Sequence, residues 1–122
     1  MYPLEERTYK FSKNIITICQ KIPNSQINNN ITNQLVRSVT SVGANYREAN
    51  GAISRLDFRN KIHICKKEAH ESHYWLNLLL DSNEHLRDKI RPLAKEAEEL
   101  TLIFGEIVSI MKSSKDKFNI QK

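Results

Sequence analysis

The residues with the clearest chemical potential are His70 and His73, which lie three positions apart beside Glu68 and Glu71. Such a cluster on a helix would suit a di-iron carboxylate site. That site needs a Glu-x-x-His motif on each of two helices and a glutamate from each of two more. Neither glutamate is followed three residues later by a histidine, and the other two histidines have no partner at metal-ligand spacing. We therefore expect no metal site and no cofactor.

The two cysteines, Cys19 and Cys65, offer little for catalysis. Both fall on apolar stripes, where a thiol behaves as a small hydrophobic side chain. A nucleophilic cysteine would need a neighbouring base and a polar cleft. The three glycines are scattered, so no glycine-rich loop is present to hold a phosphate group. The sequence predicts no catalytic residues, and we expect a protein that is not an enzyme.

Basic residues are concentrated in the middle of the chain, whose net charge is +5. Positions 37–67 hold seven basic and two acidic residues, whereas positions 68–111 hold nine acidic and four basic residues. The basic segment could contact nucleic-acid phosphates, form a solvated face, or meet the acidic segment of another subunit. The candidate nucleic-acid-binding residues are Arg37, Arg47, Arg55, Arg59, Lys61, Lys66 and Lys67. On ideal helices, about half of them can face one way.

Four helices must position these residues, because apolar side chains recur in four segments at alternating steps of four and three. That spacing averages 3.5 residues and keeps one stripe of a helix facing its partners. The stripes run over residues 4–22, 35–53, 58–79 and 86–111, with Thr8 and Ser72 as polar exceptions. Each stripe predicts a long amphipathic helix with its apolar side in a common core.

Turn-forming residues separate the four stripes. Residues 23–25 (Pro-Asn-Ser) and 50–51 (Asn-Gly) predict the ends of the first and second helices. Ser54 is expected to cap the third helix, with Asp57 in the place of the usual glutamate. Residues 81–83 (Asp-Ser-Asn) predict the end of that helix. The connections after the second and third helices are short, which makes neighbouring helices antiparallel.

The sequence thus predicts an all-α protein, an antiparallel up-down-up-down four-helix bundle. The bundle domain is expected to span residues 1–112, and residues 113–122 form a polar basic tail that frays. We expect Pro92 in the first turn of the fourth helix; the alternative is a separate turn over residues 86–91 joined by a kink. The first ten residues do not resemble a signal peptide and no apolar run could span a membrane, so we expect a cytoplasmic protein.

Two further features of the predicted helices concern packing. The second helix is rich in small residues, and Gly43 in its interior costs about 1 kcal/mol relative to alanine. Close approach of another helix, within the bundle or between subunits, would offset that cost. Tyr74 and Trp75 are adjacent aromatic residues on the third helix. We expect Trp75 to pack in the core or an interface, and the alternative is stacking on an RNA base.

A segment of the second and third helices resembles a known family. Its members carry a motif close to Gln-Leu-x-Arg-small-x-x-Ser-(Ile/Val)-x-(Ala/Ser)-Asn-x-x-Glu, and this chain matches it at Gln34, Leu35, Arg37, Ser41, Val42, Ala44, Asn45 and Glu48. The start of the third helix matches at Ser54, Arg55, Asp57 and Phe58, and a later stretch at Glu71, Ser72, Tyr74, Trp75 and Leu76. The family is the four-helix bundle family named for a protein encoded in 23S rRNA intervening sequences. The family-motif residues of most interest are Ser41, Asn45, Glu48, Glu71 and Trp75.

The resemblance implies a bacterial, non-enzymatic bundle that assembles as a homo-oligomer, with a homopentamer as the expected state. A related accessory protein of diversity-generating retroelements is similar in fold and binds nucleic acid and a reverse transcriptase. The resemblance therefore implies RNA or DNA as a partner, without assigning a binding role to particular residues. The alternative is a scaffold that docks a partner protein and has no nucleic-acid role.

Overall fold

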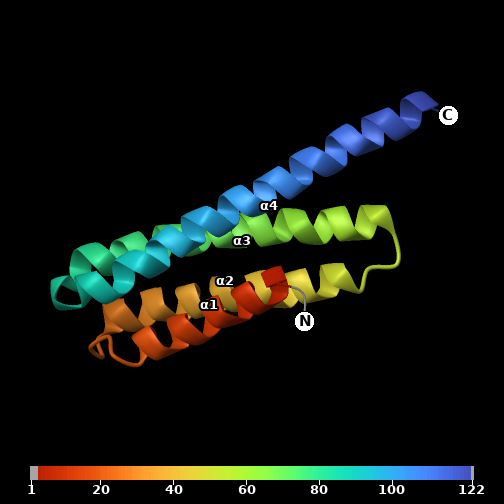
Figure 1. Ribbon diagram of the computed structural model, residues 1–122. Coiled ribbons are helices and arrows are strands. Elements are labelled where there is room, and N and C mark those ends of the chain that lie inside the picture. The colour runs from red at the N-terminus through yellow and green to blue at the C-terminus, as the bar shows by residue number, and fades with distance from the viewer. Residues whose placement is uncertain (1–2, 122) are drawn as a thin grey trace.

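Four long helices make up the protein, and the sequence-based prediction of an all-α four-helix bundle is confirmed. The computed structural model describes the backbone of residues 3–121 and the side chains of residues 3–112. The helices are α1 (Pro3–Cys19), α2 (Gln26–Asn50), α3 (Arg55–Ser82) and α4 (Arg87–Gln121), and a short 3-10 turn, η1 (Glu84–Leu86), precedes α4. Figure 1 shows consecutive helices running in opposite directions, with α4 continuing past the end of α1.

The helices do not pack equally on one another. α3 packs along its length on both α2 and α4, whereas α1 packs on α2 and makes a smaller contact with α4. Because α1 is the shortest of the four long helices, it covers only part of the bundle. α2 and α4 therefore extend beyond the part of the bundle that α1 covers.

Helix ends follow the local signals in the sequence. The Ser54 side chain accepts a hydrogen bond from the backbone N–H of Asp57 at 3.0 Å, which confirms the predicted cap of α3. Ser25 caps α2 in the same way through the N–H of Asn28. α2 ends at Asn50 and α3 ends at Ser82, as predicted.

Three details of the prediction are wrong. α4 begins at Arg87, so Pro92 is its sixth residue and lies beyond the first turn. Without an N–H, this proline cannot donate to the carbonyl of Asp88 one turn earlier. α1 ends at Cys19, so Ile22 is buried from the connection that follows and not from the helix. Ile53 was predicted to extend the stripe of α2, but it lies in the α2–α3 connection and is 98% exposed.

The rest of the apolar stripes form the core. All four helices contribute, and burying each large apolar side chain stabilises the fold by about 1.5–3 kcal/mol. Thr8 and Ser72, the polar exceptions of the stripes, are buried with them. The largest fully buried side chains include Phe11, Ile15, Leu35, Ile62, Leu76, Leu79, Ile90, Leu100 and Phe104.

Two further predictions concern the C-terminal tail and the membrane. The side chains of residues 113–122 lie outside the described residues, so fraying of the tail stays a prediction. Across the part of the chain that the structure covers, no helix has a stretch apolar and long enough to cross a bilayer.

Candidate nucleic-acid interface

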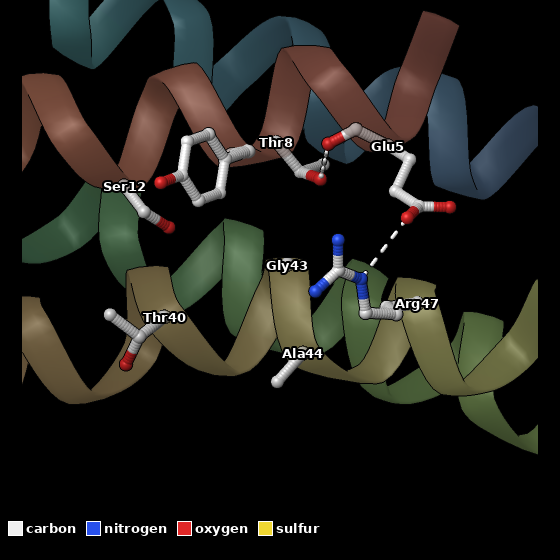
Figure 2. Close-up of a pocket in the computed structure, with 8 residues that line it drawn as sticks. Glu5, Thr8, Ser12, Thr40, Gly43, Ala44 and Arg47 are labelled. Atoms are coloured by element: carbon white, nitrogen blue, oxygen red, sulfur yellow. Dashed lines mark hydrogen bonds and ion pairs between the residues drawn. The ribbon is translucent and has the colours of Figure 1, made fainter. Parts of the chain in front are cut away.

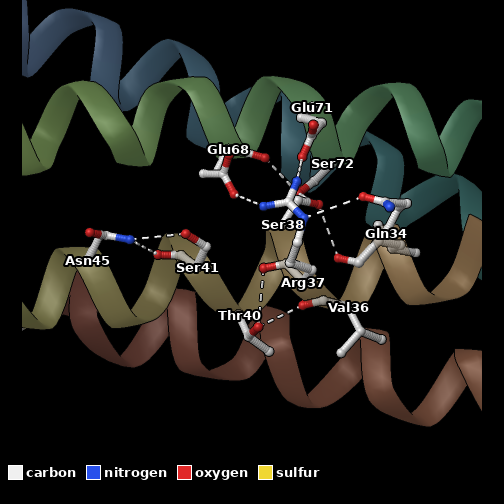
Figure 3. Close-up of polar contacts among 11 residues, drawn as sticks. Gln34, Val36, Arg37, Ser38, Thr40, Ser41, Asn45, Glu68, Glu71 and Ser72 are labelled. Carbon is white, nitrogen blue, oxygen red and sulfur yellow. Dashed lines mark hydrogen bonds and ion pairs between the residues drawn. The ribbon is translucent and has the colours of Figure 1, made fainter.

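Arg37 on α2 is tied to the carboxylates of α3. Its Nη1 donates to Oε2 of Glu68 at 2.8 Å, and its Nη2 pairs with Glu71. Figure 3 shows the guanidinium lying between the two helices with both carboxylates turned toward it. The Glu68 side chain is only 6% exposed, so its charge depends on this partner. Arg37 is therefore not a free cation for phosphate binding.

Arg47 and Lys61 are also paired with carboxylates. Arg47 Nε donates to Glu5 of α1 at 3.1 Å, and Lys61 Nζ donates to Glu48 of α2 at 2.9 Å. The hydrogen bond from Asn50, followed by the one from Arg47, lowers the pKa of Glu5 below its ordinary value. The hydrogen bond to Glu48 raises the pKa of Lys61. Exposed pairs of this kind add little stability, but they balance the charge of each cation locally.

The other four candidates lie on α3 and have no carboxylate partner among the described side chains. They are Arg55, Arg59, Lys66 and Lys67. Arg55 Nη2 donates to the backbone carbonyl of Met111 on α4 at 3.0 Å. A Cβ built on Gly105 of α4 would lie 3.5 Å from Cε of Lys66. These contacts place Arg55 and Lys66 on the side of α3 that borders α4. Arg59 follows Arg55 by one helical turn, and Lys67 lines the same groove as Thr101 of α4. We call these four residues the basic face of α3.

An open groove of about 570 Å³ lies between α3 and α4 along this face. It is lined by His63, Lys66, Lys67, His70 and Thr101. The two histidines and the threonine were not among the sequence candidates. Periodicity alone places His63 and His70 beside Lys66 and Lys67 on α3, but Thr101 joins them only through the register of α4 against α3. The groove gathers two lysines and two histidines where a polyanion could approach.

A second, smaller cavity of about 150 Å³ separates α1 from α2 (Figure 2). Gly43 and Ala44 line this space, and the hydroxyl groups of Thr8 and Ser12 lie beside it. The Thr40 hydroxyl instead donates to the carbonyl of Val36 on its own helix. A Cβ built on Gly43 would stand 3.7 Å from the nearest atoms of α1, which is ordinary van der Waals contact. α1 does lie against Gly43, since these atoms include the backbone carbonyl oxygen of Thr8, but the approach leaves room for a methyl group and does not require glycine. A polar cleft lies beside this contact.

The family-motif residues gather on the outer side of the α2–α3 pair. Asn45 Nδ2 donates to the carbonyl of Ser41 at 2.9 Å and to its hydroxyl, as Figure 3 shows. Glu48 and Glu71 accept from Lys61 and Arg37 as described. The two ion pairs join α2 to α3, whereas the Asn45–Ser41 hydrogen bonds lie within α2. These contacts give this part of the motif a structural role.

Trp75 is the remaining family-motif residue. Its ring meets Tyr74 with centroids 5.0 Å apart at 72°, and its buried indole N–H has no hydrogen-bond acceptor in the described part of the chain. Trp75 is half-buried against the core, in line with the expected packing role. Tyr74, in contrast, is 58% exposed.

The cysteines and acidic residues do not form a reactive site. Burial raises the pKa of the Cys19 thiol to about 11 and that of the Cys65 thiol to about 12. Within residues 3–112, no three His, Cys, Asp or Glu side chains come close enough together to hold a metal ion.

Comparisons with known proteins identify a matching family and a similar solved structure. Residues 4–105 match the model of a family described as 23S rRNA-intervening sequence protein. A crystal structure of a protein of unknown function, from the S23 ribosomal protein family of Bacteroides thetaiotaomicron, is similar with a TM-score of 0.77 and 34% identity. The similarity covers 85% of this chain and 96% of that one. No curated protein matches the chain.

Proposed function

This chain belongs to the 23S rRNA-intervening sequence protein family, and from that premise we propose a non-enzymatic, homo-oligomeric bundle that binds the phosphate backbone of RNA or DNA. The binding surface is the basic face of α3. The protein acts in the cytoplasm, where such nucleic acids are present. Its assembly is a ring of identical subunits, with five as the expected number, and the ring multiplies a modest surface by avidity.

One observation carries the nucleic-acid proposal. Arg55, Arg59 and Lys66 recur at helical spacing along the α4 side of α3, and Lys67 lines the groove with Lys66. None of the four is paired with a carboxylate within the described residues. Unpaired cations release counterions when they meet phosphates, which drives binding without base recognition. The paired cations Arg37, Arg47 and Lys61 contribute less, because binding would require them to exchange one partner for another.

Exposed apolar side chains support the assembly. Ile53 is 98%, Leu56 61% and Ile110 61% exposed, at the end of the bundle where Arg55 meets Met111. An open groove beside them is lined by Phe58 and Met111 among others. A second copy of the chain would remove this surface from water, which is the usual reason for such a patch.

A salt titration tests the binding proposal. Affinity for structured RNA and for duplex DNA is measured by fluorescence anisotropy between low and physiological salt. We expect log K to fall with log [salt] with a slope near −0.9 for each duplex phosphate contacted, so about four contacts give a slope near −4. The double variant K66E/K67E should flatten this slope and weaken binding.

A charge-matched control separates the basic face from net charge. Lys10 on α1 and Lys95 on α4 are exposed and form no ion pair among the described residues. The variant K10E/K95E changes the net charge by the same amount but leaves the basic face intact, so its binding should stay close to that of the parent. Equal losses in both double variants would contradict a localised site, and absence of binding at low salt would reject the proposal.

The second candidate function is a protein-interaction scaffold with no nucleic-acid role. The exposed apolar side chains of Ile53, Leu56 and Ile110 favour it as much as they favour assembly. The two are distinguished by solution mass after nuclease treatment. Self-assembly predicts a multiple of the chain mass that Ile53→Asp reduces, whereas a scaffold predicts a monomer with the patch uncovered.

A further inference from the structure

We infer that the α3–α4 groove takes single-stranded nucleic acid, whose phosphates follow the basic residues while an unpaired base stacks on Tyr74. This inference rests on the proposed nucleic-acid function and narrows it to one ligand class and one site. Three observations carry it: the linear order of the side chains along α3, the small Thr101 side chain on the α4 side of the groove, and the exposed Tyr74 ring one turn beyond the groove.

Three of the α3 side chains that line the groove form a row that Tyr74 continues beyond it; they are His63, Lys67 and His70. The four residues follow one another at steps of four, three and four, so they lie on one face of the helix about one turn apart. With a rise of about 1.5 Å per residue, the row is about 16 Å long. Lys66 stands beside it at the edge of α4. A flexible strand can place successive phosphates along such a straight row.

The α4 side of the groove is bordered by Thr101, which contributes a small hydroxyl-bearing side chain. Gly105 lies one turn further along α4, where the Lys66 side chain occupies the space beside it. His63, Lys66, Lys67 and His70 form no ion pair with a carboxylate in the described part of the chain. Glu98 of α4 lies near the Tyr74 end of the row, with its Oε2 3.6 Å from Nε2 of His73. The basic part of the row is thus the stretch from His63 to His70.

The exposed ring of Tyr74 favours a single strand over a duplex. Its ring is 58% exposed and meets Trp75 at 72°, so the two rings are tilted and do not stack on each other. Bases of a duplex are already stacked on their neighbours, whereas an unpaired base can turn out and stack on an aromatic side chain. A charged groove that follows the backbone, joined to an aromatic platform, is the usual arrangement for binding single strands.

The experiment compares four ligands with the full-length protein. They are a single strand of about 12 nucleotides as RNA and as DNA, a blunt duplex of the same sequence, and a strand of the same length without bases. We expect the single strand to bind more tightly than the duplex. Tyr74→Ala should weaken single-strand binding by about tenfold, since one stacked base is worth about that factor. Binding of the abasic strand should not change, and Tyr74→Phe should restore the affinity.

A charge variant tests the groove from its α4 side. Thr101→Glu puts a carboxylate among the basic residues and should weaken the abasic and normal strands alike. Thr17 on α1 is exposed, and Thr17→Glu changes the net charge equally at a distance from α3, so it should leave binding unchanged. Circular dichroism and thermal melting confirm that each variant is folded.

The outcomes distinguish a failure of this inference from a failure of the proposed nucleic-acid function. If the duplex binds at least as well as the single strand, or if Tyr74→Ala has no effect while K66E/K67E abolishes binding, the inference is wrong and the proposed function stands. If no nucleic acid binds at low salt, both fall. If an acidic peptide of equal charge competes as well as the strand, the groove is a general polyanion site and the inference is again wrong.

Discussion

Arg37 Nη1 lies 2.8 Å from Oε2 of Glu68, and this contact joins α2 to a carboxylate that is almost completely buried in α3. The two residues are 31 positions apart, so the pair exists only because the two helices pack in this register. Ser38 and Ser72 lie beside it with their hydroxyl oxygens 2.8 Å apart inside the core. The α2–α3 interface therefore contains a short row of polar contacts among its apolar contacts.

Removing the arginine should leave the buried carboxylate without its partner. We expect Arg37→Ala to lower the free energy of unfolding by about 2 kcal/mol, because an unsatisfied buried charge loses its compensation. Adding Glu68→Gln should recover part of that loss, since the amide carries no charge. Urea unfolding followed by circular dichroism measures both. A loss in the double variant equal to the sum of the two single losses would show that the residues act independently.

Gly43 offers a stabilising substitution. A Cβ there meets α1 only at ordinary contact distance, so Gly43→Ala should raise the free energy of unfolding by about 0.5–1 kcal/mol through the higher helix propensity of alanine. Ala44→Gly, one position along and exposed, should lower it by a similar amount. Thermal or urea unfolding checks the pair. Destabilisation by Gly43→Ala would mean that α1 lies closer to α2 than the structure shows.

Acid should weaken the contact between α1 and the end of α2. The hydrogen bonds from Asn50 and Arg47 lower the pKa of Glu5 in the folded state. A depressed pKa means that the carboxylate stabilises the fold above its ordinary pKa of 4.5, and that this contribution is lost as the pH falls through the lower folded-state value. Glu5→Gln should remove that part of the pH dependence below about pH 4.5. An unchanged profile of stability against pH would contradict the assignment.

The thiols should be nearly unreactive while the protein is folded. Burial raises the pKa of Cys65 to about 12 and that of Cys19 to about 11, so both are protonated at pH 8. Because the thiolate is the reactive form, labelling by iodoacetamide should be far slower than in denaturant, and slower at Cys65 than at Cys19. Mass spectrometry of labelled peptides measures the two rates. Fast labelling of Cys65 under native conditions would show that the core opens frequently.

Local signals in the sequence predicted the helices well. The apolar stripes identified nearly all of the core, and Ser54 and the Asn50–Gly51 pair marked helix ends correctly. The failures came where a local pattern continued past the end of the element. Ile53 continued the spacing of α2, but the chain had already turned at Gly51. Pro92 is an unfavourable interior residue, yet packing of the preceding turn of α4 against the bundle extends the helix back to Arg87.

The candidate site was predicted less completely. The seven basic residues were found as a group, but their separation into paired and unpaired sets was not. Glu5, Glu48 and Glu68, which balance three of the cations, lie on other helices than the residues they pair with. The sequence likewise could not show Thr101 as part of the groove, because no sequence spacing relates it to Lys66.

By itself, the sequence determined the number of helices, the face that each one buries, most of their ends and the family to which the chain belongs. All of these follow from residue spacing along one helix or from short motifs, and a helix repeats its geometry every 3.6 residues whatever surrounds it. Only the tertiary structure decided which cations are balanced and which line the α3–α4 groove. A side chain on one helix meets a side chain on another according to how the two helices slide and rotate against each other, and that register is set by the packing of the whole core.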